Sequence, residues 1–284
     1  MKNPKVKTFF RTFFGRGVII KISSIVALLF ILGAVLAPVI SRYDPNEIDL
    51  TMMLQDPTGE HLLGCDAQGR DVFTRLLYGA RISLLASVFS CMLAAAVGMV
   101  LGLVAGYYEK VAATLILRYI DIQLSIPPLL FTIIIGMLIG RSLFGLIVAI
   151  AFGLVPGFTR MMYGLVLQIK ESDYIIALRL AQIPTWKILM FHLLPNCFPS
   201  MIVMFATNLG SAIMLESTLS FLGIGIQLPT ASWGNMVSDG YSYIFMKPLL
   251  AFVPGICITL TVVAFNIIGD SLRDALDPRL RGKL

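Results

Sequence analysis

The sequence is poor in charged residues. Only 13% of its 284 residues are Asp, Glu, Lys or Arg, whereas a soluble domain carries about a quarter. Hydrophobic residues make up 57% of the chain. A surface that faces lipid needs no charge, so this composition indicates an integral membrane protein rather than a globular domain in water.

Residues for metal or catalytic chemistry are also scarce. The only histidines are His61 and His192, and the four cysteines show no CxxC or Cys/His spacing. The sequence contains no GxxxxGK[ST] phosphate loop, no HExxH and no GxSxG motif. We therefore expect no metal site, no cofactor and no catalytic activity, and any ATP must be bound by another polypeptide.

The net charge of +6 could suggest binding to nucleic acid. The Lys and Arg residues, however, cluster at the N-terminus and between apolar runs. They do not alternate with aromatics along a basic face. The charge is therefore interpreted as a signal of membrane topology, and no nucleic-acid partner is expected.

Six apolar runs are long enough to cross the hydrocarbon core, which takes about 20 residues. The first has no clear cleavage pattern after it, so we interpret it as an attached membrane helix rather than a signal peptide. The sequence predicts an all-α integral membrane protein with about six transmembrane helices. The predicted spans are Ile22 to Ile40, Ile82 to Tyr107, Ile122 to Gly140 with an alternative earlier start through Arg118, Leu143 to about Thr159 with a helical extension toward Lys170, Met201 to Leu222, and Leu249 to Ile268.

The distribution of Lys and Arg predicts that both termini are cytoplasmic. With this orientation 16 of the 22 basic residues lie on the inner side and six on the outer side, as the positive-inside rule requires. The predicted segments are a basic cytoplasmic N-terminus (1–21), the first transmembrane helix (22–40), an extracytoplasmic segment (41–80) and a five-helix core (81–284) that contains a cytoplasmic loop (168–196).

Small residues recur at every fourth position of the second span, at Ala94, Gly98, Gly102 and Gly106. In lipid, helices associate through close backbone contact rather than through a hydrophobic drive. We expect this stripe to face another helix of the bundle.

Prolines interrupt the next two spans. Pro127 and Pro128 fall in the third span and Pro156 in the fourth. Each removes a backbone donor and usually kinks a helix. Kinks suit a protein that opens and closes, but they also occur in static membrane helices.

Glu216 is the one acid that falls well inside a predicted span. A charge within the membrane costs roughly 2.5 to 3.5 kcal/mol on insertion scales, so it should face the bundle interior, a polar cavity or a partner. Asn208 lies about two turns earlier on nearly the same face. Two interpretations stay open: an interhelical hydrogen bond, or a polar lining of a substrate path.

The cytoplasmic loop predicts two short helices. The first covers the stretch from Glu171 to Ala181 and can be capped by Ser172 or Asp173. The second begins after Pro184 and is expected to end near Leu194, before Pro195. The amphipathic pattern fits either a docking surface for a partner or a helix that lies on the inner membrane surface.

Three further stretches carry a resemblance that extends over nearly the whole chain. They resemble the C-type inner-membrane permease subunits of binding-protein-dependent ABC importers of the dipeptide, oligopeptide and nickel group. The stretches are His61-Leu-Leu-Gly-Cys-Asp-Ala-Gln-Gly-Arg-Asp71 with Arg75-Leu-Leu-Tyr-Gly-Ala-Arg-Ile-Ser-Leu84, Leu215-Glu-Ser-Thr-Leu-Ser-Phe-Leu-Gly-Ile-Gly225 with Pro229 and Ser232-Trp-Gly-Asn235, and Asn266-Ile-Ile-Gly-Asp-Ser-Leu-Arg-Asp-Ala-Leu-Asp-Pro-Arg279.

The family's cytoplasmic signature has the form Glu-Ala-Ala, three residues, Gly, and later Leu-Pro. Here it falls on Ile176-Ala177-Leu178, with Gln182 at the glycine position and Leu194-Pro195 at the end. The acid and the glycine are both absent. Gln adopts a positive φ less readily than Gly, so Pro184 is expected to set the turn.

The resemblance implies a type I importer permease fold in the bacterial inner membrane, surrounded by lipid. It implies as partners a second permease, two cytoplasmic ATPases that bind ATP, and an extracytoplasmic binding protein. The cargo is a dipeptide, a longer peptide, nickel or a metal chelate. We hypothesise that the ATPase-coupling surface consists of Tyr174, Ala177, Leu178, Arg179, Gln182 and Trp186, and that Glu216 and Asn208 lie on the path or between helices.

Two other classes of protein are weighed against this one. An ion-coupled secondary transporter would be expected to show more intramembrane ionisable groups and an internal repeat. A membrane-embedded hydrolase would need a catalytic motif, and none appears. The resemblance favours the permease over both.

Overall fold

The structure is a computed structural model that describes residues 13–108 and 110–276. Every regular element in these ranges is a helix, as predicted. The elements are η1 (Phe14–Arg16), α2 (Val18–Ile40), η2 (Leu50–Met52), α3 (Val72–Tyr107), α4 (Val111–Ser125), α5 (Pro128–Ile139), α6 (Leu143–Lys170), α7 (Asp173–Leu180), α8 (Thr185–Lys187), the π-helical segment η3 (Ile188–Leu193), α9 (Leu194–Phe221), α10 (Trp233–Tyr241) and α11 (Leu249–Leu276).

Five or six spans cross the membrane by length and composition. Within the described residues, five continuous helical stretches are long and apolar enough: α2, α3, α6, the run from α8 through α9, and α11. The pair α4 and α5 makes a sixth if it is counted as one broken span. Residues 1–12 of the predicted basic N-terminus, and residues 277–284, lie outside the described part of the chain.

The second span begins ten residues earlier than predicted. Helix α3 starts at Val72 rather than Ile82 because the Asp71 carboxylate accepts a hydrogen bond from the Thr74 amide at 2.7 Å and caps the helix. The end of the predicted extracytoplasmic segment is therefore helical. The prediction missed these first turns because Arg75 and Arg81 interrupt the apolar run there.

The predicted third span is broken rather than kinked. Helix α4 ends at Ser125, α5 begins at Pro128, and their axes differ by 96°. A residue before proline is pushed out of the helical region, and the tandem prolines apply this restriction to both Ile126 and Pro127. Both are extended, with ψ of 132° and 129°. Pro128 then starts the new helix, where its missing N–H costs nothing.

The second cytoplasmic helix does not stop at Leu194. It continues through the π-helical segment η3 into α9, so Thr185 to Phe221 form one helical run. Pro195 lies in the first turn of α9. A proline cannot donate to the preceding turn and clashes with the carbonyl four residues earlier, and the wider π turn accommodates it there.

The predicted stripe of small residues packs against α6. A Cβ added at Gly102 would lie 2.6 Å from Cβ of Met162, and one added at Gly106 would lie 2.6 Å from Cβ of Val166. Gly98 meets Phe158 in the same way. The prediction is confirmed: the glycines let the backbones of α3 and α6 approach closely.

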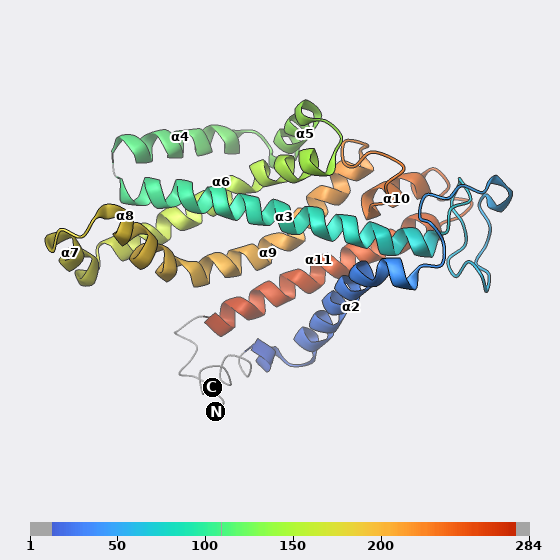
Figure 1. Ribbon diagram of the computed structural model, residues 1–284, viewed down its shortest axis with the longest axis horizontal. Helices are drawn as coiled ribbons and strands as arrows, with labels where there is room; N and C mark the ends of the chain where they lie inside the picture. The colour runs from blue at the N-terminus through green and yellow to red at the C-terminus, as the bar shows by residue number, and fades with distance from the viewer. Residues whose placement is uncertain (1–12, 109, 277–284) are drawn as a thin grey trace.

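The polar segments gather at opposite ends of the bundle. Figure 1 shows α7 and α8 at one end, with the segment between α2 and α3 and helix α10 at the other. Helix α4 runs alongside α3 at the edge of the bundle. The arrangement separates the two ends where partners could bind.

Candidate functional site

The candidate coupling surface is an exposed tip formed by α7 and α8. The side chains of Tyr174, Ala177, Arg179, Gln182 and Trp186 are exposed there, and Trp186 is 57% exposed. Leu178 is half-buried and packs against the hydrophobic core between α3, α6 and α9. Five of the six predicted residues therefore lie on the accessible surface, and Leu178 supports it from beneath.

The turn after α7 is a Schellman motif. The Ile183 amide donates to the Leu178 carbonyl at 3.1 Å, and the Gln182 amide donates to the Arg179 carbonyl at 3.0 Å. Gln182 has a φ of +53°. Gln182 thus adopts the left-handed conformation at the family's glycine position, and the expectation that Pro184 sets the turn in its place is wrong.

Replacing Gln182 with glycine is expected to stabilise the chain. The left-handed conformation costs an L-residue about 1–2 kcal/mol, and glycine avoids this cost. Thermal unfolding of the purified chain should shift upward by about 2 °C. Gln168→Gly, inside α6, is the matched control and should lower the midpoint; a decrease for both variants would contradict the strained turn.

Two contacts fix the tip to the membrane helices. The Arg179 guanidinium lies 5.0 Å from the centre of the Tyr107 ring at the end of α3. The Asn196 amide donates to the Tyr174 hydroxyl at 2.9 Å and so joins α9 to α7. These contacts join the tip to α3 and α9.

The tip also exposes apolar residues that the sequence-based prediction missed. Leu180 is 80% exposed, and Ile176 of α7 and Met190 and Phe191 of η3 are also exposed. Ile176 and Leu180 occupy the opposite face of α7 from the buried Ile175 and the half-buried Leu178. An apolar helix face that carries no core contacts of its own typifies an interaction site.

Glu216 is completely buried in a cage of hydroxyl groups. Its Oε1 accepts from Ser220 at 2.8 Å and its Oε2 from Ser217 at 3.3 Å. Ser83 of α3 and Ser232 before α10 also hydrogen-bond to it. Asn208 lies apart, and its amide donates to the Met204 carbonyl at 2.8 Å. This geometry favours the interhelical alternative, with Glu216 joining α3, α9 and α10.

Glu216→Gln is expected to keep most of the stability, whereas Glu216→Leu is expected to lower it by about 1–3 kcal/mol. The amide oxygen still accepts from a serine hydroxyl and the NH2 group donates to hydroxyl oxygens that rotate to accept, but leucine leaves the hydroxyls buried without this partner. Unfolding of both variants in detergent measures the difference. Loss of transport in a stably folded Glu216→Gln variant would instead favour a place on the path.

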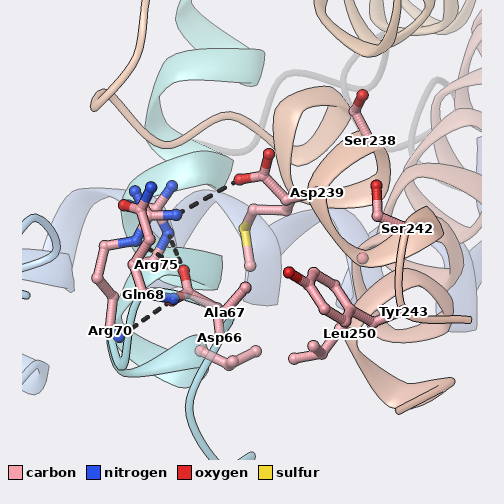
Figure 2. Close-up of a pocket in the computed structure, with 13 residues that line it drawn as sticks. Asp66, Ala67, Gln68, Arg70, Arg75, Ser238, Asp239, Ser242, Tyr243 and Leu250 are labelled. Carbon is pink, nitrogen blue, oxygen red and sulfur yellow. Dashed lines mark hydrogen bonds and ion pairs between the residues drawn. The ribbon is translucent and has the colours of Figure 1, made fainter. Parts of the chain in front are cut away.

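An ion-pair network lies at the opposite end of the molecule (Figure 2). Arg70 Nε lies 2.7 Å from Asp66, Arg70 Nη2 lies 3.4 Å from Asp239 of α10, and Arg75 Nε lies 3.4 Å from Asp66. Arg75 also donates to the carbonyls of Pro45 and Pro229. Asp66, Arg70, Arg75 and Asp239 line a cavity of about 340 Å³.

The network fastens the segment before α3 to α10. Both arginine side chains are almost fully buried, while Asp239 remains 39% exposed. Burial raises the pKa of the Asp239 carboxyl, and the neighbouring Arg70 and Arg75 oppose the rise. The arrangement is a rigid polar surface at the end that the Lys/Arg distribution predicts to be extracytoplasmic.

Two charged residues lie inside long helices. Asp121 lies inside α4, which agrees with the alternative start of the third span near Arg118. Arg160 lies inside α6, in the predicted helical extension toward Lys170, and this extension is confirmed.

The fold has five or six candidate membrane spans, two polar ends and an exposed apolar tip, as expected of a multi-span membrane protein. Residues 98–282 match the family described as "Binding-protein-dependent transport system inner membrane component". This match covers more than half of the sequence, and the chain belongs to this family of inner-membrane permeases. The resemblance stated from the motifs is confirmed.

Several proteins of known role are similar to this chain over nearly its whole length. The dipeptide transport system permease protein DppC of Alkalihalophilus pseudofirmus is 40% identical, covering 89% of this chain and 83% of that protein. DppC of Haemophilus influenzae is 37% identical, with 99% and 96% covered. The glutathione transport system permease protein GsiD of Pectobacterium atrosepticum is 38% identical, with 97% and 91% covered.

The family fixes the class of activity and of partners. The chain is a non-catalytic, multi-pass permease of an ABC importer in the inner membrane. A binding-protein-dependent system works with an extracytoplasmic binding protein, an ATPase and a paired permease. Among the predicted alternatives, the ion-coupled transporter and the hydrolase do not agree with this family.

Proposed function

We propose that this chain is one half of the membrane path of an importer for short peptides. The names of the three relatives described above support this cargo, since they refer to dipeptides or to glutathione, a tripeptide. None of these three names refers to nickel or to a metal chelate. The second permease completes the path, and two ATPases bind ATP on the cytoplasmic side.

The observation that carries the proposal is the exposed apolar tip of α7 and α8. Leu180 and Trp186 are 80% and 57% exposed and offer an apolar surface there. ATP binding can change the bundle only if the ATPases contact an element whose position differs between two states. The contacts of Arg179 with Tyr107 of α3 and of Tyr174 with Asn196 of α9 support the tip as this element, because they join it to the membrane helices.

Reconstitution in lipid vesicles tests the proposal. Vesicles should contain both permeases with the ATPases inside, and binding protein with labelled dipeptide outside. We expect dipeptide accumulation only with internal ATP, and none when the ATPase cannot hydrolyse it. Accumulation that persists without ATP but collapses with an ionophore, or uptake of nickel and not of dipeptide, would contradict the proposal.

A further inference from the structure

A cavity of about 310 Å³ lies beside the end of the first membrane helix. Its walls come from the residues that follow α2, from the loop around Glu60 and from the first turn of α3. Pockets that hold small molecules typically measure about 300–1,000 Å³, so the cavity is large enough for a small polar group. Its lining includes Ile40, Arg42, Glu60, Leu62, Phe73 and Thr74.

The length of α2 places this cavity at the surface of the bilayer. Helix α2 has 23 residues, which extend over about 35 Å at 1.5 Å per residue. The hydrocarbon core is about 30 Å thick, so both ends of a helix of this length lie close to an interface. Ile40 is the last residue of α2. The cavity that Ile40 and Arg42 line therefore lies at the level of the lipid headgroups.

The exposed face of α2 has the composition of a helix that faces lipid. Helix α2 lies at the edge of the bundle, where it packs against α3 and α11 (Figure 1). Its small residues Ala27, Ala34 and Ala37 are buried, whereas Val35 and Val39 are 66% and 81% exposed. None of the exposed residues of α2 is Gly, Ala, Ser or Thr. Membrane helices present small residues to a partner helix, so the outward face of α2 suits lipid better than a second protein.

Contacts within the chain hold the walls of the cavity in place. The Tyr43 ring stacks on the His61 ring, with centres 4.7 Å apart. Nδ1 of His61 lies 2.9 Å from Oδ1 of Asp71, and Oδ2 of Asp71 caps α3 through the Thr74 amide. Tyr43, Asp71 and Thr74 all line the cavity. The site is therefore formed before a ligand arrives, which lowers the entropy cost of binding.

The lining combines one positive group, one negative group and apolar side chains. Arg42 and Glu60 are exposed, and neither forms an ion pair with another of the described residues. Ile40 and Leu62 expose apolar surface in the same lining. Thr74 is buried, and its Oγ1 has no hydrogen-bond partner within residues 13–108 and 110–276. The cavity thus offers separate partners for an anion, a cation and a hydrocarbon chain.

We propose that this cavity binds the headgroup of a zwitterionic phospholipid that carries a primary ammonium group, such as phosphatidylethanolamine. The Arg42 guanidinium binds the phosphate, because its planar set of donors matches phosphate oxygens. The Glu60 carboxylate accepts from the ammonium group, and the acyl chains extend from Ile40 along the outward face of α2. The Lys and Arg distribution predicts that this is the outer leaflet. An anionic headgroup fits less well, because it offers no cation to Glu60.

A photocrosslinker at Leu62 in the assembled importer reports which lipid occupies this cavity. In vesicles with equal amounts of phosphatidylethanolamine and phosphatidylglycerol, we expect the first to be crosslinked about tenfold more, as two charge-assisted contacts allow. Arg42→Gln and Glu60→Gln should each abolish most of this preference. Arg141→Gln and Glu47→Gln, which replace exposed residues outside the lining, are the matched controls and should keep it. Equal crosslinking of both lipids, or a preference that survives in Arg42→Gln and Glu60→Gln, would overturn the proposal.

The same crosslinker distinguishes the other occupants of the cavity. Inorganic phosphate and glycerophosphoethanolamine, added at millimolar concentration, should not lower the yield of crosslinked lipid; displacement by either would identify a site for a soluble ion and overturn the proposal. A crosslink to the second permease or to the binding protein would also overturn it. A photocrosslinker at Val35, on the outward face of α2 and outside the lining, should react with both lipids equally. The same preference at Val35 as at Leu62 would show that the cavity is not its cause.

Discussion

Replacing Leu180 and Trp186 together with glutamate is expected to abolish ATP-driven uptake while the chain still inserts and pairs with the second permease. Both side chains are exposed at the tip, so the substitutions disturb no core packing. Two carboxylates buried against an apolar partner surface without counter-charges cost several kcal/mol. Co-purification of the ATPases and uptake in reconstituted vesicles measure the effect.

The conservative variants Leu180→Met and Trp186→Phe are the controls. They keep an apolar surface of similar volume, so the ATPases should bind and uptake should persist. Normal uptake in the double glutamate variant would contradict a coupling role for the tip. Such a result would favour the alternative that α7 lies on the membrane surface.

Replacing Gly102 with valine is expected to prevent the normal association of α3 and α6. A Cβ there already lies 2.6 Å from Cβ of Met162 and 2.9 Å from the Tyr163 amide nitrogen. The helices must separate, and lipid supplies no hydrophobic drive to hold them at the larger distance. We expect a loss of stability on the order of 3 kcal/mol, the upper range for overpacking.

Thermal unfolding of the detergent-purified chain measures this loss. Gly255→Val is the matched control because a Cβ at Gly255, in α11, would meet no atom within 4 Å. Its midpoint should stay within about 1–2 °C of the unmodified chain, since surface changes are usually within 0.5 kcal/mol. Equal midpoints for the two variants would show that the α3–α6 contact does not depend on close approach.

Much of the fold could be predicted because hydrophobic runs and small-residue spacing depend on local sequence. The glycine stripe of α3 specified a helix contact correctly, although not that α6 provides it. The start of α3 could not be found from apolar runs, because Arg75 is buried by paired carboxylates and backbone carbonyls that are distant in sequence.

The sequence contains a signal for the break at Pro127 and Pro128. Two successive prolines deny helical geometry to two successive residues, which favours a break over a kink. The sequence contains no such signal for the hydrogen-bond partners of the buried polar residues. Glu216 is enclosed by Ser83 and Ser232, which are contributed by other elements. The pairing of Asp121 with Arg160 spans 39 residues and likewise depends on the tertiary fold.

A photocrosslinker placed at Leu180 in intact membranes tests the central claim most directly. If the tip of α7 and α8 transmits the work of the ATPase, the label should crosslink to the ATPase subunit, and the yield should change when nucleotide is trapped. A thiol at the same position should stay unlabelled by an impermeant reagent added outside whole cells. Crosslinking to lipid alone, or labelling from the outside, would contradict the account.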